Sequence, residues 1–176
     1  MIKNSIALIG FMATGKTTIG KALVKYLGIE YKFIETDQEI IKEVGKSIPE
    51  IFAEEGELRF REYEISVCEK VSRLNKVVIS CGGGVALSKK NIENLRKNCY
   101  IVLLNANPNE IYKRSLKNGI ETRPIINKMN LKKEIEKVLK VRSPYYETSA
   151  EVVINTTNKS IEDIVREIII KTGIKT

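Results

Sequence analysis

The sequence predicts an α/β protein in which a parallel β-sheet is covered by helices on both faces. Short apolar runs rich in β-branched residues alternate along the chain with longer runs of helical periodicity, and this alternation is typical of βαβ units. The chain has 176 residues, 43% of them hydrophobic and 30% charged, which is the length and composition of one globular domain. We therefore expect a single domain spanning residues 1–176.

Five short apolar runs are the expected strands. They are Ser5–Ile9, Tyr31–Glu35, Val77–Ser80, Cys99–Leu104 and Val152–Asn155. The runs between and after them carry apolar residues at helical spacing. The expected helices are Lys16–Tyr26, Gln38–Val44, Ile51–Ala53, Glu57–Leu74, Lys89–Lys97, Asn109–Leu116, Leu131–Val141 and Ser160–Lys171. Pro49 separates the two short helical pieces, and a polar stretch over Lys117–Met129 interrupts the alternation.

Composition excludes several kinds of chemistry. The chain has no His, so it lacks a Ser-His or Cys-His couple, a His-ligated zinc and a His general base. The three cysteines, Cys68, Cys81 and Cys99, include no C-x-x-C pair, which argues against a zinc site and a disulfide framework. We expect them to be buried thiols in a reducing cytosol. No apolar run reaches the roughly 18 residues that a membrane helix needs.

Basic charge is concentrated in one part of the chain. The formal net charge is +8, and the stretch Lys113–Arg142 alone has ten Lys or Arg against three Glu. One interpretation is a solvated loop and helix face. The other, which we favour because Arg123-Pro124 lies in its middle, is a lid over about residues 115–127 that is attracted to a polyanion.

The segment Gly10-Phe-Met-Ala-Thr-Gly15-Lys16-Thr17 matches the phosphate-binding motif G-x-x-x-x-G-K-[ST]. It follows an expected strand and begins an expected helix, as the motif requires. Its backbone N–H groups and the helix N-terminus form an anion site, Lys16 reaches the β- and γ-phosphates, and the Thr17 hydroxyl binds Mg²⁺. Motors and switches with this loop also need an Asp at the end of a later strand. The strands that end at Ser80 and before Asn105 lack one, which favours small kinases.

Two other strand ends carry unusual residues. Asp37 follows the second expected strand, and Gly82-Gly83-Gly84 follows the third. Ligands of open parallel sheets bind beyond the carboxyl ends of the strands. Asp37 is therefore either a helix cap or a functional carboxylate. The glycines are either a flexible turn or a place where a ligand touches the backbone.

Arg61 is expected on one face of the long helix with Leu58, Ile65 and Cys68, inside an apolar stripe. A charge in such a place needs a partner. Glu57 and Glu64 on neighbouring turns are structural candidates, and an anionic substrate is the alternative because a guanidinium binds a carboxylate through two hydrogen bonds. The spacing does not decide between them.

Together these residues resemble the shikimate kinases, small P-loop kinases of aromatic amino-acid biosynthesis. The resemblance covers nearly the whole chain. It rests on Gly10–Thr17, Thr36-Asp37, Ile51-Phe52 leading to Phe60-Arg61, Gly82–Gly84, Arg123-Pro124, and Arg142-Ser-Pro-Tyr145. It implies a three-layer fold like that of nucleoside-monophosphate kinases, with a five-stranded parallel sheet, a lid and a small helical substrate-binding segment at about residues 38–62.

The resemblance also implies the roles of individual residues. Asp37 would hold the shikimate hydroxyls and take the proton from the 3-hydroxyl, which is phosphorylated by ATP. Arg61 and Arg142 would bind the substrate carboxylate, Phe52 and Phe60 would wall the ring, and the backbone of Gly82, Gly83 and Gly84 would touch the substrate. Catalytic roles fall to Lys16, Asp37 and Arg123. The implied ATP-binding residues are Ala13, Thr14, Gly15, Lys16, Thr17, Thr18, Arg114, Arg123 and Lys159, with Arg114 and the Thr157–Ser160 loop beside adenine.

The metal site departs from the family pattern. The family usually has Asp-Thr-Asp where this chain has Glu35-Thr36-Asp37. We expect Thr17 to bind Mg²⁺ directly and Glu35 to assist through water, with a carboxylate one methylene longer than usual.

The alternative within the same class is a kinase for another sugar acid, such as a gluconokinase. The pair Arg61 and Arg142 beside an aromatic wall favours a compact ring carboxylate. A nucleotide sensor would not need Asp37 and two arginines. A nucleic-acid-binding NTPase is disfavoured because the basic stretch has no aromatic residue after Tyr112. We expect a cytoplasmic monomer that binds ATP and shikimate and neither nucleic acid nor membrane.

Overall fold

The computed structural model describes residues 3–117 and 130–175. The predicted Arg123 and most of the predicted lid lie outside these ranges. The strands are β1 (Ser5–Ile9), β2 (Lys32–Glu35), β3 (Val77–Ser80), β4 (Cys99–Asn105) and β5 (Val152–Asn155). The helices are α1 (Lys16–Leu27), α2 (Thr36–Val44), α3 (Ile48–Glu54), α4 (Gly56–Val71), α5 (Lys89–Arg96), α6 (Pro108–Lys117), α7 (Leu131–Ser149) and α8 (Ile161–Thr172), with a 3₁₀ turn at Val85–Leu87 that the sequence did not predict.

The described strands form one five-stranded sheet in the order β2-β3-β1-β4-β5, and all neighbours are parallel. The chain passes from β1 to the edge strand β2, returns to β3 between them, and then crosses to β4 and β5 on the other side of β1. In open parallel sheets, ligands bind beyond the carboxyl ends of the strands at such a reversal. The topology therefore places the predicted site at the end of β1.

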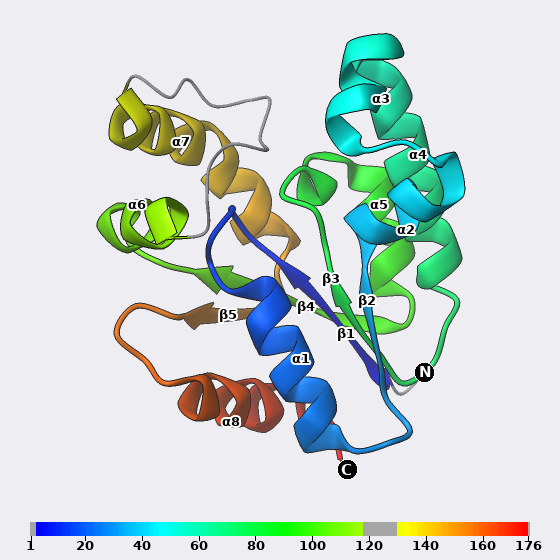
Figure 1. Cartoon of the computed structure of the whole chain (residues 1–176). Coiled ribbons are helices and arrows are strands. Elements are labelled where there is room, and N and C mark those ends of the chain that lie inside the picture. The colour runs from blue at the N-terminus through cyan, green and yellow to red at the C-terminus, as the bar shows by residue number, and fades with distance from the viewer. Residues whose placement is uncertain (1–2, 118–129, 176) are drawn as a thin grey trace.

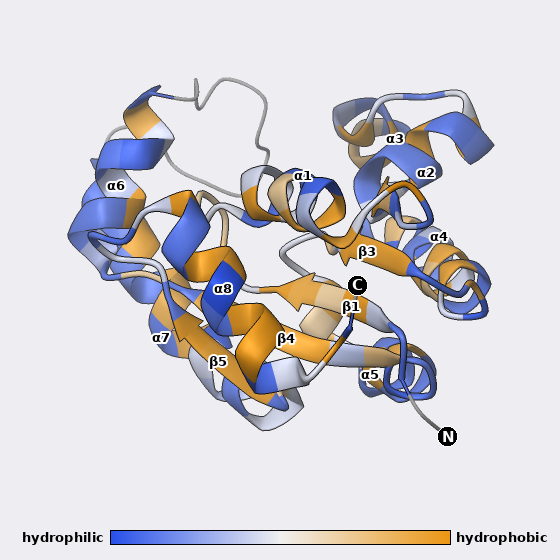
Figure 2. Ribbon diagram, turned by 90° about the horizontal axis from the view of Figure 1, so that it is seen from below, coloured by the Kyte–Doolittle hydropathy of each residue, from blue (hydrophilic) through white to orange (hydrophobic). Residues whose placement is uncertain are grey.

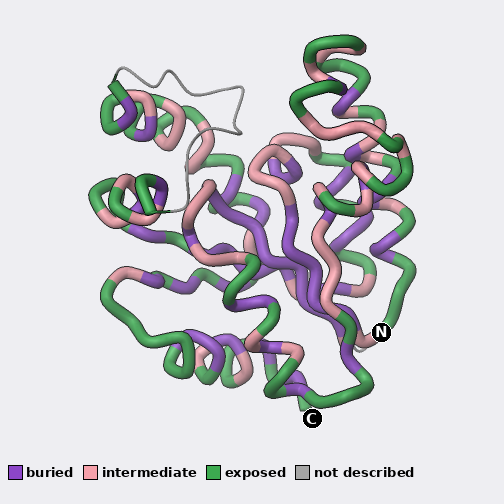
Figure 3. Tube along the Cα trace, in the orientation of Figure 1, coloured by how far each residue is buried: buried purple, intermediate pink, exposed green. Residues whose placement is uncertain are grey.

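Both faces of the sheet are covered, as the sequence predicts (Figure 1). In β1, Ala7 and Ile9 point into a core formed with α4, α5 and α7, whereas Ile6 and Leu8 point into a second core formed with α1 and α8. All five β1 residues are buried. The central strands are buried along their length (Figure 3), and the outward faces of the helices are mostly hydrophilic (Figure 2).

The three cysteines lie in this interior, which confirms the prediction of buried thiols. Burial raises the pKa of each thiol, so the cysteines stay protonated and serve as apolar packing groups.

Helix α7 differs most from the prediction, because it continues past Val141 to Ser149. Pro144 cannot donate the backbone hydrogen bond of a helix interior, and this favours an end before it. Tertiary contacts outweigh that cost. The Tyr146 side chain is buried, and its hydroxyl donates to the Gly83 carbonyl oxygen at 2.7 Å. Arg142 therefore lies within a helix rather than after one.

Helix α3 also begins earlier than predicted. Ser47 and Glu50 form a reciprocal capping box, and Pro49 lies in the first turn, where its missing N–H costs nothing. Pro49, which was expected to separate two helical pieces, therefore lies in the first turn of α3.

The expected apolar stripe of the long helix is partly wrong. Cys68 is buried, but Leu58 is 85% exposed because the first turn of α4 extends beyond the sheet. Helices α2, α3 and α4 rise on one side of the carboxyl edge of the sheet, and α6 and α7 rise on the other (Figure 1).

Candidate active site

The loop between β1 and α1 has the geometry of a phosphate-binding loop. Gly10 has φ 136°, and a Cβ there would lie 2.3 Å from the Leu104 carbonyl oxygen of β4, so only glycine fits. Gly15 is the N-cap of α1 with φ 99°. The Lys16 ammonium donates to the carbonyl oxygens of Gly10 (2.9 Å) and Phe11 (2.8 Å), so it lies across the loop. The loop therefore has the backbone conformation that the motif predicts, and anion binding there stays a prediction.

A cavity of about 510 Å³ opens above this loop, and we call it the P-loop cavity. Nearly all the predicted nucleotide and metal residues line it. They are Ala13, Thr14, Gly15, Lys16, Thr17, Thr18, Glu35, Arg114 and Lys159. Thr17 donates its hydroxyl proton to Glu35 Oε1 at 2.6 Å, which brings the two predicted metal residues together.

The other end of the P-loop cavity is formed by α6 and the end of β5. Arg114 donates from Nε to Glu110 (2.9 Å), from Nη1 to the Thr156 hydroxyl (3.0 Å) and from Nη2 to the Thr156 carbonyl oxygen (3.0 Å). Lys159 pairs with Glu167 at 2.5 Å. These contacts hold two cationic side chains at the cavity wall.

A second cavity, of about 690 Å³, lies between α3, α4 and α7. We call it the arginine cavity, because Arg61 and Arg142 line it from α4 and α7. Phe52 and Phe60 also line it, with ring centroids 4.8 Å apart and planes at 40°. The predicted clamp and aromatic wall thus lie in one cavity.

The two cavities share a boundary. Asp37, in the first turn of α2, lines both of them, as do Gly82 and Gly83. A Cβ on Gly82 would lie 2.4 Å from Asp37 Oδ1, so glycine is needed for the carboxylate to reach this position. The alternative that Asp37 is only a helix cap is not favoured, because the N-cap of α2 is Glu35 and Asp37 is inside the first turn.

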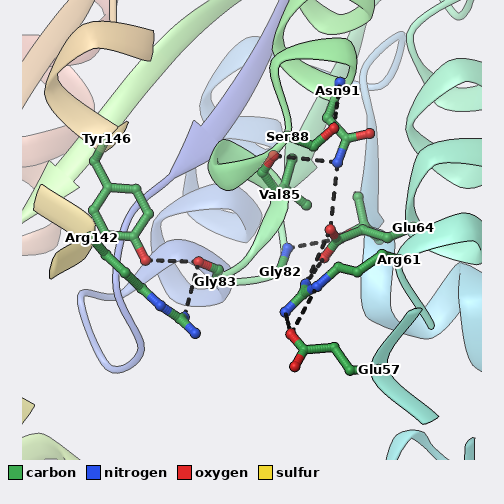
Figure 4. Close-up of polar contacts among 11 residues, drawn as sticks. Glu57, Arg61, Glu64, Gly82, Gly83, Val85, Ser88, Asn91, Arg142 and Tyr146 are labelled. Carbon is green, nitrogen blue, oxygen red and sulfur yellow. Dashed lines mark hydrogen bonds and ion pairs between the residues drawn. The ribbon is translucent and has the colours of Figure 1, made fainter. Parts of the chain in front are cut away.

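Arg61 has both structural partners that the sequence offered. Its guanidinium pairs with Glu57 at 2.9 Å and with Glu64 at 3.1 Å (Figure 4). Glu64 is 1% exposed, and Asn91 approaches it with an amide N–H at 3.5 Å. Burial raises the pKa of Glu64 to about 7, since desolvation outweighs the attraction of Arg61.

The third glycine makes room for Arg61. A Cβ on Gly84 would lie 2.1 Å from Arg61 Nη1, so the guanidinium rests directly on this backbone. On the other side, Arg142 Nη1 reaches the Gly83 carbonyl oxygen at 3.5 Å beside the stronger bond from Tyr146 (Figure 4). The glycine run is therefore the surface on which the charged groups of the site lie.

Sequence reasoning missed several lining residues. Met12 and Gln38 line both cavities, and Tyr146 fixes the glycine turn, whereas its neighbour Tyr145 is 49% exposed. The spacing of four residues between Arg142 and Tyr146 was the available signal, but it counts only if the helix continues through Pro144. Among the described residues no cluster of three acidic, Cys or His groups forms a metal cage.

A parallel sheet with a phosphate-binding loop after β1 and a second cavity joined to it by an acidic residue defines a P-loop kinase of small molecules. A family model for shikimate kinase matches residues 12–172, so the chain belongs to the shikimate kinase family. A shikimate kinase of Caldicellulosiruptor bescii is 45% identical over 153 residues, which are 87% of this chain and 86% of the relative.

The structural comparisons agree. The shikimate kinase of Acinetobacter baumannii in complex with shikimate has a TM-score of 0.87 and 30% identity, covering 95% of this chain and 91% of that one. A gluconokinase of Sinorhizobium meliloti has a TM-score of 0.60 and 18% identity, covering 98% and 93%. The second likeness shows a common fold alone. In the part of the chain that the structure describes, no helix combines the length and apolar character needed to cross a membrane.

Proposed function

We propose that the chain transfers the γ-phosphoryl group of ATP to the 3-hydroxyl of shikimate. The observation that carries the proposal is the position of Asp37, which lines both a cavity with a phosphate-binding loop and a cavity with two arginines. Phosphoryl transfer depends on positioning and on charge stabilisation, and the two cavities meet where donor and acceptor must meet. Family membership supports ATP and shikimate as the two substrates.

The acceptor binds in the arginine cavity. Arg61 and Arg142 hold its carboxylate, because a guanidinium offers paired N–H groups that match two carboxylate oxygens. Phe52 and Phe60 cover the ring. Asp37 holds the hydroxyls and accepts the proton of the one that attacks. The helices of this side, within residues 38–62, form the substrate-binding segment.

The donor binds in the P-loop cavity. The backbone of Ala13 to Thr18 and the N-terminus of α1 hold the phosphates, and Lys16 moves from its loop carbonyls to the β- and γ-phosphate oxygens. Arg114 and Lys159 line the end away from the loop, where adenine lies. Arg123 lies outside the described residues, and its role in stabilising the transferring group stays a prediction.

The residues present fit a magnesium ion. Thr17 and Glu35 offer only oxygen atoms, and their side chains are already in contact at 2.6 Å in the wall of the P-loop cavity. Mg²⁺ prefers few protein oxygens together with phosphates and water. Thr17 would hold the ion directly and Glu35 through water, and the bound ion would supply charge neutralisation at the β- and γ-phosphates.

The proposal is tested by ADP release from MgATP with shikimate, gluconate, quinate, AMP or single-stranded RNA as the added acceptor. We expect release with shikimate only, and a product one phosphate heavier whose ³¹P NMR spectrum places the ester on the 3-oxygen. Release with gluconate or AMP would overturn the acceptor. Gel filtration with light scattering tests the expected monomer, and fractionation of the source cell tests the cytoplasmic location.

A further inference from the structure

We propose that Thr156 is a positioning residue for ATP that fixes both ends of the P-loop cavity. The inference rests on the proposed function of that cavity and deepens it. Thr156 follows β5, is 1% exposed, and lies against groups from three other parts of the chain, namely Thr14 in the loop, Asn105 at the end of β4 and Arg114 on α6. A buried hydroxyl that joins three segments at a ligand cavity has more than a packing role.

The first effect of Thr156 is on Arg114. Two nitrogens of the guanidinium, Nη1 and Nη2, bond to two oxygens of this single residue, each at 3.0 Å. Nε is bound to Glu110 one turn back on the same helix. Together these bonds fix both the position and the plane of the guanidinium where it lines the cavity. A flat cation held in one plane is ready to stack on a base without losing further side-chain freedom.

The second effect is on the phosphate-binding loop. The Thr156 hydroxyl lies 3.3 Å from the Thr14 carbonyl oxygen and 3.1 Å from that of Asn105. Both carbonyl oxygens are within hydrogen-bond distance of the one hydroxyl proton, and the Asn105 oxygen also accepts the Thr156 N–H at 2.7 Å. In a trans peptide the N–H points opposite to the C=O. Holding the Thr14 carbonyl toward Thr156 therefore turns the Gly15 N–H away from it, toward the phosphates.

The hydroxyl thus accepts from Arg114 at the base end and lies within donating distance of Thr14 at the phosphate end of the same cavity. It touches nothing in the arginine cavity, whose lining does not include it. Its loss is expected to weaken nucleotide binding and to leave shikimate binding unchanged.

The experiment compares Thr156→Val, which keeps the shape and removes the hydroxyl, with Thr156→Ser, which keeps the hydroxyl. The matched control is Thr172→Val, since Thr172 also has a buried hydroxyl, bonded to the Ile168 carbonyl oxygen at 2.8 Å in α8. Each variant is measured by calorimetric titration with MgADP and by KM for ATP and for shikimate. Thr156→Ala replaces the valine variant if that variant does not fold.

We expect Thr156→Val to raise the Kd for MgADP and the KM for ATP about tenfold, because one net hydrogen bond is worth about an order of magnitude. The KM for shikimate stays within twofold, Thr156→Ser restores binding, and Thr172→Val changes neither constant. An unchanged Kd for MgADP in Thr156→Val, or an equal loss in Thr156→Ser, would overturn the inference. Calorimetry with MgADP needs no acceptor, so it gives this answer even if shikimate is not the substrate.

A double-mutant cycle with Arg114→Met separates the two effects. If Thr156 acts through Arg114, the valine change costs less in the Arg114→Met background than in the wild type. The part of the loss that remains in that background measures the contacts with Thr14 and Asn105. If the valine change costs as much in the Arg114→Met background as in the wild type, Thr156 does not act through Arg114.

Discussion

The anion site at the loop end of the P-loop cavity is built mainly from backbone, whereas the arginine cavity is built from side chains that hold one another in place. In the first, two glycines with positive φ and the N-terminus of α1 shape the anion site. In the second, Arg61 depends on Glu57, Glu64 and the bare backbone of Gly84. Nucleotide binding and acceptor binding are therefore expected to be lost through different substitutions.

The largest effect is expected from Lys16→Ala. This change leaves the backbone loop intact but removes the one long cation that spans it, so turnover falls by about two to three orders of magnitude. Steady-state ADP release measures it, with Lys25→Ala as the control because Lys25 is exposed on the same helix. Turnover above a tenth of the wild-type value would mean that the loop backbone supports phosphoryl transfer without the Lys16 ammonium.

Gly84→Ala tests the side-chain cavity by a steric change. The backbone of Gly84 has φ −95°, which alanine adopts without strain, so the fold survives. The new Cβ displaces the Arg61 guanidinium, and the KM for shikimate rises about a hundredfold, the range for losing charge-assisted hydrogen bonds. The KM for ATP stays within threefold. Equal rises in both constants would contradict the separation of the two cavities.

Arg61→Lys is a milder change in the same place. Lysine keeps the charge but replaces the planar fork by a point charge, so the KM for shikimate rises about tenfold with a smaller change in kcat. An unchanged KM for shikimate would show that Arg61 serves Glu57 and Glu64 only, and would leave Arg142 as the carboxylate ligand.

The smallest effect concerns stability and pH. The pKa of Glu64 is raised to about 7 in the folded protein from an ordinary value of 4.5, so the native state binds the proton more tightly than the unfolded state does. The free energy of unfolding therefore falls as pH rises from about 4.5 to about 7, by at most about 3 kcal/mol from this group. Urea titrations between pH 5 and 8 should show that the free energy of unfolding falls less with pH in Glu64→Gln than in the wild type.

The control for this prediction is Glu57→Gln, which removes the exposed partner of the same arginine. Its stability should depend on pH as the wild type does. If the free energy of unfolding of Glu64→Gln falls with pH as steeply as that of the wild type, the pH dependence belongs to other groups.

The two cavities also differ in how far the sequence predicts them. The P-loop cavity follows from a local motif, and its residues from Ala13 to Thr18 line it as expected. The roles of Arg61 and the glycine run could not be decided from spacing, because an ion pair to Glu64 and a close approach to Gly84 depend on how α4 packs against the turn after β3. Tyr146 was missed because its contact with Gly83 requires that α7 continue through Pro144.

For the fold, the alternation of strands and helices predicted the sheet and its two covered faces. Two elements differ from that prediction. Helix α7 passes through Pro144 because Tyr146 gains a buried contact, and Leu58 is exposed because α4 begins beyond the sheet. In both cases the tertiary environment of the helix, rather than its local sequence pattern, decides the outcome.

The central claim is that the two cavities meet at Asp37 and that this carboxylate accepts the proton of the acceptor hydroxyl. The direct test is single-turnover phosphoryl transfer in Asp37→Asn, with MgADP and shikimate binding measured separately by calorimetry. We predict that both ligands bind within about threefold to tenfold of wild type while transfer slows by about two to four orders of magnitude. Transfer at a rate within threefold of wild type would contradict the account.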